Sequence, residues 1–590
     1  MPNIAELTER YFLRPGDLAA VRRVDEQPGD TTHHGEHVPS VTEGNDVLYL
    51  IDGEDYFGKI YEELIPPTAP SGTHPFFYFT DWFLELGGGF TLRREGVPLS
   101  EQLQTMSSAG VDVRALVWVS LPIMAAPSPE GELARHFVHD IATFNRISLE
   151  SVVNLRVNPS LRSRVLLNLL AHPAGGIHLK LVLSGDDSHV RAFVGGLDFS
   201  SSRNCNRRHT RGGESNLGKW HDAGVRIDGP AAAEIYHHFA SLWNEQISQG
   251  VTTFRIAGVD HPIPSHFVGQ ALPNENSPPM ADRTWPIPQR PTDGSPWTRT
   301  KRIQLLRTLP QMRFGAQARN TPLRPSSFAF FGSMNSLHRP PLQTAPTGLF
   351  EFMPALHKAI SNAQKYIYIE DQAFSSFDVM QWIQNALREN PTLKAIFVYG
   401  RDPQDPPNPG TPEASRRYLF GLDPGRPVVP QTWWSNIAFY ERREIIIHSK
   451  VTIIDDVWVA IGSANCMRRS LYTDAELSVG IIDEPDAASP SEGLCTVADF
   501  RCSLWAEHCN EYDQPEGDTL LPENMRNIDH ALALWSPPGT VRSGMGVWPG
   551  MPPGTLRTSF RRFDNPPDLP RVPFNRFEYD TKDPDSTQLF

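Results

Sequence analysis

One series of segments occurs twice, in the same order, along this chain of 590 residues. The first series has apolar runs at 76–85, 111–119, 175–183, 190–198 and 222–229, followed by a longer stretch at 231–246. The second has runs at 365–374, 392–400, 444–454, 457–465 and 475–482, followed by a stretch at 499–509. Short runs rich in β-branched and aromatic residues predict buried strands, and each final stretch predicts a helix. We therefore expect a duplicated α/β fold whose two α/β/α halves each contain a mixed sheet.

Equivalent landmarks in the two series are separated by a nearly constant distance. The histidines His178 and His448 are 270 positions apart, and the glycines Gly195 and Gly462 are 267 positions apart. Ordered landmarks at a steady offset indicate an internal duplication. They predict a bilobal molecule whose functional site lies at the interface of the halves.

The composition changes along the chain mark the expected domain boundaries, because proline-rich polar stretches favour linkers and surface loops. The expected regions are an N-terminal extension (1–45), a first half (46–257), a proline-rich linker with the start of the second half (258–330), a second half (331–512) and a proline-rich C-terminal tail (513–590).

The overall composition is that of a folded soluble protein, with 39% hydrophobic residues and a formal net charge of −14. Nucleic-acid binding is not expected, since phosphate backbones usually select a basic surface. No segment approaches the roughly 18 to 20 continuous apolar residues of a membrane span. The N-terminus lacks the apolar core of a signal peptide. We expect a soluble protein that is cytoplasmic or exported by a signal-independent route; the oligomeric state stays open.

Charged residues interrupt an apolar strand-like segment in both halves. The segment IIIHSKVTIIDDVWVAIGSAN contains His448, Lys450 and Asp455 among β-branched residues, and the first half has His178 and Lys180 at the same spacing. Side chains two residues apart point to the same face of a strand. Each lysine is therefore expected to face the same space as its histidine.

Two histidines on equivalent strands can meet across a pseudo-twofold axis. With a reference pKa of about 6.5, one imidazole can be neutral and attack an electrophile while the other is charged and protonates the leaving group. Two lysines beside them would stabilise a phosphate whose charge grows in the transition state. The pattern predicts displacement at phosphorus, for which no cofactor and no metal is required.

A reacting imidazole needs an acceptor on its other nitrogen to fix the tautomer. The candidates are Asp222 for His178, and Glu476 or Asp474 for His448. In the turn that follows the second motif, Ser463 and Asn465 are candidates to bind phosphate oxygens.

The segment HSKVTIID…GSANCMRRSLYTDAEL resembles the second catalytic motif of the phospholipase D superfamily, in which H-x-K-x4-D is followed by G-S-x-N. Further segments are similar to the true phospholipase D branch, namely IYIEDQAF, RIQLLRTLP, WHDAGVRIDGPAA and LWAEH. The resemblance covers roughly residues 70 to 510, in both halves. It implies a covalent phosphohistidine on His178, with His448 as general acid, that is resolved by water or a second alcohol.

The first motif departs from this pattern. Gly185 stands where the resemblance predicts an aspartate, and the interval from histidine to glycine is 17 residues against 14 in the second copy. Asp186 or Asp187 is expected to fill the place after a longer hairpin turn. The resemblance gives this aspartate, and Asp455 in the second copy, a structural role.

We interpret the sequence as a phospholipase D that hydrolyses the head-group phosphodiester of glycerophospholipids and transfers the phosphatidyl group to alcohols. Its expected partner is a phospholipid at a membrane or micelle surface, which it would meet as a peripheral protein. One alternative is a nuclease or other phosphodiesterase of the same superfamily, which a basic groove would favour. The other is a catalytically decayed phospholipid-binding member, which the altered first motif would favour.

Overall fold

The computed structural model describes residues 3–20, 37–64, 73–87, 89–93, 96–119, 132–171, 176–207, 209, 219–249, 253–256, 259–262, 277–289, 292, 299–310, 342–372, 374, 376–400, 418–421, 430–442, 445–472, 474–483, 493–508, 523–529, 531, 541–543 and 559–562.

Within the described residues, each half contains a run of six neighbouring strands in the same spatial order. In the first half the neighbours are β4 (Val165–Asn168), β3 (Asp112–Trp118), β2 (Phe76–Asp81), β5 (Leu181–Gly185), β6 (Val190–Gly195) and β8 (Ala223–Asp228). In the second half they are β15 (Ile437–Arg442), β14 (Lys394–Gly400), β13 (Tyr366–Asp371), β17 (Lys450–Ile454), β18 (Trp458–Gly462) and β19 (Glu476–Ile482). The first three strands of each series are parallel and the remaining pairings are antiparallel, so the expected mixed α/β sheet is confirmed.

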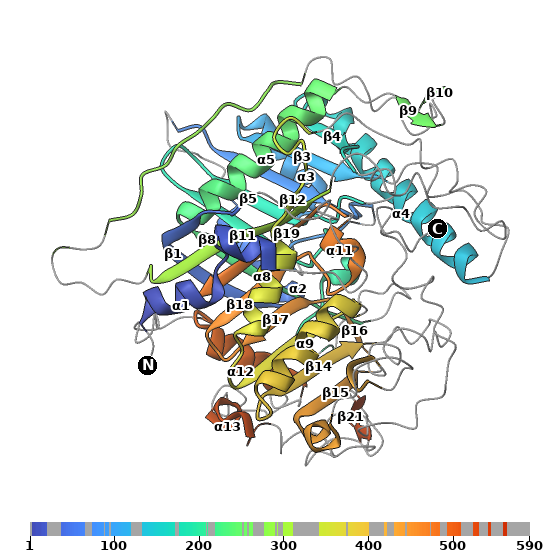
Figure 1. Ribbon diagram of the computed structural model, residues 1–590. Helices are drawn as coiled ribbons and strands as arrows, with labels where there is room; N and C mark the ends of the chain where they lie inside the picture. Colours follow the sequence, from blue (N-terminus) through green and yellow to red (C-terminus); the bar gives the residue numbers. More distant parts are fainter. Residues whose placement is uncertain are drawn as a thin grey trace, which may run out of the picture.

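The two sheets join into one. Strand β1 (Val41–Ile51) pairs antiparallel with β8 and, through its first residues, with β11 (Lys301–Leu309). Strand β11 in turn pairs antiparallel with β19. Figure 1 shows the resulting sheet running through the molecule from the first half to the second. The halves are therefore held together by backbone hydrogen bonds as well as by side chains.

Helices cover both faces of this sheet. On one face, α5 (Pro230–Gln249) and α12 (Val497–His508) share a single hydrophobic core that spans both halves. On the other face, α2 (Asp52–Glu63), α3 (Leu99–Ser108) and α4 (Glu132–Val157) cover the first half, and α1 (Ile4–Tyr11), α8 (Phe352–Ser361) and α9 (Phe377–Glu389) cover the second. Residues along each strand alternate between the cores: Tyr366 and Tyr368 lie in the shared core, whereas Ile367 and Ile369 pack under α8 and α9. This is the period-two pattern of a strand buried on both faces.

The predicted strand 444–454 is wrong in one respect, because it is broken at His448. Its first part, β16 (Ile445–Ile447), pairs in parallel with β7 (Lys219–His221) of the other half. Its second part, β17, pairs with β13 of its own half. The chain leaves one partner for the other at His448 and Ser449. The predicted strand of the first half is broken at the equivalent place. Strand β5 begins only at Leu181, and Ile177 forms an isolated parallel bridge with Ala475 of the other half.

The expected N-terminal extension packs against the second half. Leu7, Tyr11, Phe12 and Leu13 are buried in the core under α8, and the Tyr11 hydroxyl donates to Asp455. Most of the expected tail lies outside the described residues, although β21 (Ser559–Arg562) pairs with β15. The remaining described elements are η1 (Pro15–Ala20), η2 (Ser201–Arg203), β9 (Thr253–Ile256), β10 (Val259–Pro262), β12 (Leu349–Phe350), η6 (Gln431–Asn436), α11 (Arg468–Tyr472), α13 (Glu523–Arg526) and β20 (Val541–Ser543).

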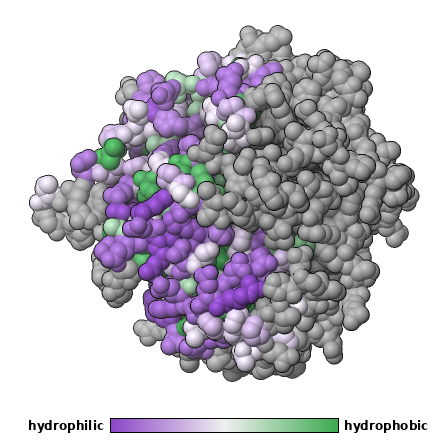
Figure 2. Space-filling model, viewed as in Figure 1, coloured by the Kyte–Doolittle hydropathy of each residue, from purple (hydrophilic) through white to green (hydrophobic). Residues whose placement is uncertain are grey.

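The described part of the face in Figure 2 is predominantly hydrophilic. Large apolar side chains that are exposed are few among the described residues: Val97, Val153, Val157 and Ile287. Within the same part of the chain, no helix has the length and apolar character needed to cross a membrane.

Candidate active site

His178 of the first half is held by the second half. Its Nδ1 atom lies 3.0 and 3.1 Å from the two carboxylate oxygens of Glu476, the first residue of β19. Its backbone N–H donates to the carbonyl of Ala475, which positions the ring beside that carboxylate. The imidazole retains 15% side-chain exposure while Glu476 has none. The remaining ring nitrogen, Nε2, is therefore the one available for reaction.

His448 of the second half is held by the first half in the same manner. Its Nδ1 atom lies 2.6 Å from Oδ2 of Asp222, and its backbone N–H donates to the carbonyl of His221. The ring of Trp220 packs edge-on against the imidazole at a centroid distance of 4.9 Å. The pairings Ile177 with Ala475 and Ile447 with His221 are equivalent, so the two arrangements are related by the internal repeat.

The expected assignment of carboxylates was wrong, because each histidine takes its acceptor from the opposite half. Glu476 holds His178, and Asp222 holds His448. Asp474 instead forms an ion pair with Arg469 and accepts from the backbone N–H of Gly176. The exchange follows from the strand breaks, which carry each histidine across to pair with the other sheet.

The two lysines lie beside the histidines, although not through a continuous strand as expected. Lys450 donates from Nζ to the carbonyl of His448, and Lys180 donates to the carbonyl of His178 over 3.2 Å. Both lysines are 3% exposed or less. The buried Lys180 ammonium also lies 3.5 Å from Asp198. The carbonyl contacts fix each ammonium close to its own histidine.

The electrostatics indicate that all four groups surround one space. Burial first, then Lys180 and Lys450, lowers the pKa of His178 well below its usual value. Burial first, then Lys450, Arg203 and Lys180, lowers the pKa of His448 in the same direction. Since each imidazole senses both lysines, the lysines converge between the halves. A buried cluster of cations of this kind favours an anionic ligand.

The two carboxylates that hold the histidines are also perturbed. Burial, reinforced by Asp474, raises the pKa of Glu476 to about 8. Burial raises the pKa of Asp222 to about 6, although Lys450 opposes the shift. Burial also lowers the pKa of Lys450 to about 8. Perturbed ionisable groups gathered at one place are typical of functional sites.

In the turn that follows β18, Ser463 does not have the role in phosphate binding that the sequence predicts. Ser463 donates from Oγ to Glu476 over 2.6 Å and accepts from the N–H of Leu477, so its hydroxyl is committed to orienting Glu476 instead of a phosphate oxygen. Asn465 is buried in the same turn, and its Oδ1 has no hydrogen-bond partner among the described residues. Its amide stays a candidate ligand for phosphate.

The glycines of the two turns are required by close approach. A Cβ atom on Gly462 would lie 2.4 Å from the carbonyl oxygen of Leu477, and one on Gly195 would lie 2.8 Å from that of Ala223. A Cβ on Gly196 would lie 2.2 Å from Oδ1 of Asp222. Glycine at that position therefore leaves room for the carboxylate that holds His448.

A pair of acidic residues next to Lys180 escaped the sequence analysis. Asp198 lies beside Lys180 and Arg203, which lower its pKa although burial opposes them. Asp81 is buried against Asp198, and burial followed by this neighbour raises the pKa of Asp81 well above its usual value. The second half has Asn465 in the position of Asp198. The available signal in the sequence was that Asp198 is an acidic residue three places after Gly195.

The two motif aspartates differ in what they bind. Asp455 has a positive φ of 58° and accepts from the backbone N–H groups of 364, 365 and 366, just before β13. Asp187 is half exposed, and its side chain contacts His74, just before β2, and Arg283. Asp186 closes the hairpin by accepting from Ser188. A Cβ on Gly185 would lie 2.2 Å from the carbonyl oxygen of His189, which explains the glycine.

Comparison with known proteins agrees with this geometry. The family model described as "Phospholipase D" matches residues 427–534, which contain His448, Lys450, Asp455 and the turn to Asn465. "Phospholipase D alpha 1" of Nicotiana tabacum is 23% identical over 545 residues, covering 75% of this chain and 62% of that protein. These matches support the phospholipase D superfamily for this chain.

Other relatives extend the similarity between this chain and proteins named phospholipase D over both halves. "Phospholipase D alpha 1" of Spuriopimpinella brachycarpa is 24% identical, covering 79% of this chain and 66% of that protein. "Phospholipase D alpha 2" of Arabidopsis thaliana is 22% identical, covering 73% and 61% respectively. The chain thus spans a little under two thirds of the length of these relatives. Among solved structures, phosphatidylserine synthase of Haemophilus influenzae Rd KW20 matches with a TM-score of 0.40 at 12% identity, covering 75% of this chain and 83% of that one.

Proposed function

We propose that the protein is a phosphodiesterase of the phospholipase D type that cleaves the head-group phosphodiester of glycerophospholipids. The observation that carries the proposal is the convergence of two buried histidine–lysine pairs, each histidine oriented by a carboxylate of the opposite half. The lipid substrate is supported by the names of the relatives, which cover about three quarters of the chain.

In the first step, Nε2 of His178 attacks phosphorus and a phosphorus–nitrogen bond forms. The bond from phosphorus to the head-group oxygen breaks, and that oxygen takes a proton from the protonated form of His448, which the negative charge of a bound phosphodiester favours against burial and the nearby lysines. Glu476 accepts from Nδ1–H of His178, which leaves the lone pair on Nε2 for attack. Lys180 and Lys450 lie where they stabilise the charge that develops on the phosphoryl oxygens.

In the second step, water attacks the phosphohistidine and gives its proton to His448, whose ring Asp222 supports. The phosphorus–nitrogen bond breaks and His178 leaves as a neutral imidazole. The products are phosphatidic acid and the free head-group alcohol. A primary alcohol in place of water gives a phosphatidyl alcohol by the same route.

The test is incubation of the protein with phosphatidylcholine vesicles and a primary alcohol, followed by separation of the lipid products. Wild type is expected to form the phosphatidyl alcohol, whereas His178→Ala and His448→Ala form none. His74→Ala is a suitable control, because its imidazole is 76% exposed and contacts Asp187, while its backbone carbonyl accepts from Arg283.

A different pattern of products would contradict parts of the proposal. Cleavage of DNA or of a small diester without any lipid product would discard the lipid substrate and keep the histidines. Full activity of either histidine variant on lipid would discard the two-histidine mechanism.

A further inference from the structure

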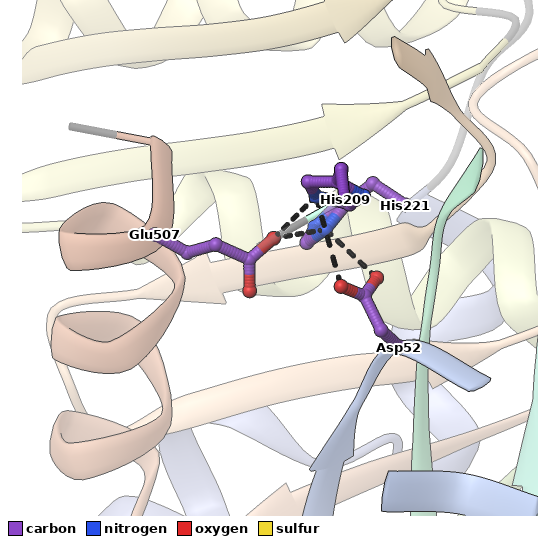
Figure 3. A group of neighbouring side chains, drawn as sticks. All are labelled: Asp52, His209, His221 and Glu507. Carbon is purple, nitrogen blue, oxygen red and sulfur yellow. Dashed lines mark hydrogen bonds and ion pairs between the residues drawn. The ribbon is translucent and has the colours of Figure 1, made fainter. Parts of the chain in front are cut away.

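A second group of ionisable side chains lies behind the pair formed by His448 and Asp222. Asp52, His209, His221 and Glu507 are each 2% exposed or less. One nitrogen or oxygen atom of each lies within 4.8 Å of all the others. Figure 3 shows the two imidazole rings and the two carboxylates turned toward one common point.

The distances between donors are those of a compact four-atom site. Nδ1 of His221 lies 3.1 Å from Asp52 and 2.6 Å from Glu507. Nε2 of His209 lies 3.0 Å from Glu507 and 3.7 Å from Asp52. Ligand atoms bound to zinc at about 2.0–2.2 Å in a tetrahedron are about 3.4 Å apart. The closest pair has to open by less than about 1 Å, which rotation of the Glu507 side chain supplies.

The outward-facing atoms of this group are held as well. Nε2 of His221 lies 2.7 Å from Glu370, and Nδ1 of His209 lies 3.4 Å from Sγ of Cys205. Oδ1 of Asp52, the atom that lies near His221, also accepts from the backbone N–H of Asp222 over 3.0 Å. Histidines that bind metal ions usually have their other nitrogen fixed by a carboxylate or similar partner, which sets the tautomer and the ring orientation.

The internal repeat gives an independent reason to assign this group a role. Ala475 occupies the position equivalent to His221, since each pairs with the residue before a reacting histidine. The first half therefore builds the same strand crossing, and holds the same kind of histidine, with a methyl group at that place. Burying charged groups is costly unless they bind one another or an ion.

We propose that Asp52, His209, His221 and Glu507 bind one divalent transition-metal ion of the zinc type. Two carboxylates balance the charge of the ion, and two neutral imidazoles complete a set of four nitrogen and oxygen ligands. All four are protein ligands within a closed environment, so the site is structural and takes no part in the chemistry. This inference does not depend on the proposed phosphodiesterase function.

Such an ion would join the halves next to the site that they share. Glu507 comes from α12 of the second half, whereas the other three ligands come from the first half. The carbonyl of His221 accepts from His448, and the next residue, Asp222, holds its ring. The ion would therefore fix the segment that positions His448.

The test is the metal content of the full-length protein, measured by mass spectrometry after purification without chelators. It is repeated after incubation with Zn²⁺, Mn²⁺ or Fe²⁺ and removal of free metal. We expect about one equivalent per chain, as for a closed four-ligand site. His209→Ala and His221→Ala should lose it. His238→Ala, which removes a buried histidine of α5 that is not among these donors, should retain it.

A spectroscopic measurement keeps the proposal falsifiable if the variants fold poorly. Exchange of wild type into Co²⁺ should produce the visible absorption of tetrahedral cobalt, and chelation should lower the melting temperature. Wild type that holds well under about 0.1 equivalent of any of these metals, before and after incubation, would overturn the proposal, because a preformed closed site binds tightly. Retention of the metal in both histidine variants would overturn it too.

Discussion

Nδ1 of His448 lies 2.6 Å from Oδ2 of Asp222, although the two residues belong to different halves of the chain and are 226 positions apart. His178 and Glu476 form the reciprocal contact over 3.0 Å. Both acceptors are therefore supplied across the interface of the halves, and each reacting ring depends on the fold of the half that does not contain it.

Replacement of either acceptor by its amide should lower turnover and leave the fold intact. Asp222→Asn and Glu476→Gln are expected to reduce kcat by on the order of 10²- to 10⁴-fold, because the amide no longer fixes the reactive tautomer of the ring. The measurement is steady-state hydrolysis of phosphatidylcholine, with circular dichroism to establish folding. Activity within a factor of two of wild type would show that these contacts do not support the reaction.

The choice of leaving group should separate the roles of the two histidines. A phosphatidyl ester of p-nitrophenol needs no protonation of its leaving group, so the first step should survive in His448→Ala. The same ester should not rescue His178→Ala, which lacks the nucleophile. The measurement is the burst of p-nitrophenol after mixing. Rescue of His178→Ala and not of His448→Ala would reverse the assignment.

Glu476 should make the stability of the protein fall as the pH rises through neutrality. Burial raises the pKa of Glu476 to about 8, so the folded protein binds a proton here that the unfolded chain has already lost above its usual pKa. The stabilisation is complete at acidic pH and is lost as the pH rises to about 8, with a slope of at most about 1.4 kcal/mol per pH unit.

Comparison with Glu476→Gln between about pH 6.5 and pH 8 isolates this effect, because the other ionisable groups, His178 among them, are common to both proteins. Denaturant unfolding of wild type and Glu476→Gln across this window should show a decline in the difference between their unfolding free energies. A constant difference would mean that Glu476 is ionised throughout.

Gly196→Ala should reduce activity through Asp222. The added methyl group would lie 2.2 Å from Oδ1 of that carboxylate, which then has to move by about 1 Å, a displacement that can cost about 100-fold in rate. Gly58→Ala in α2 is the matched control, since its Cβ meets nothing within 4 Å. Equal activity of the two variants in a vesicle assay would show that the carboxylate tolerates the methyl group.

Replacement of the two motif aspartates should change the stability of the protein by different amounts. Neither replacement should change the chemistry of the site. Asp455→Ala removes the acceptor of three backbone N–H groups and should cost about 2–4 kcal/mol of unfolding free energy. Asp187→Ala removes an exposed contact and should cost less than about 0.5 kcal/mol. Denaturant titration gives both values. A larger loss from Asp187→Ala would mean that the first half uses this residue as the second uses Asp455.

The repeated strands are recognisable in the sequence because both faces of the sheet are covered, which makes each strand a short apolar run. Gly195 and Gly462 were informative for a related reason, since no side chain fits where the neighbouring strand passes. The pairing of acceptors was missed because it depends on how two separately predictable sheets meet. No local pattern reports that a strand changes partner at His448.

The group around His221 was missed for a different reason. Its four ligating residues come from separate segments and share no short spacing of the kind that identifies metal motifs. The available signal was a histidine directly before Asp222, at the end of β7. The sequence alone gives no means of bringing Asp52 and Glu507 to that histidine.

The crosswise support of the two rings bears on how such a molecule could arise. A protein of half this length would contain a histidine and a lysine, but its carboxylate would face solvent. It would complete a site only by pairing with a copy of itself. Fusion of the two genes would keep the two halves in one chain and make that pairing permanent. Each half is then free to specialise, and the equivalent positions hold different residues, His221 in one half and Ala475 in the other.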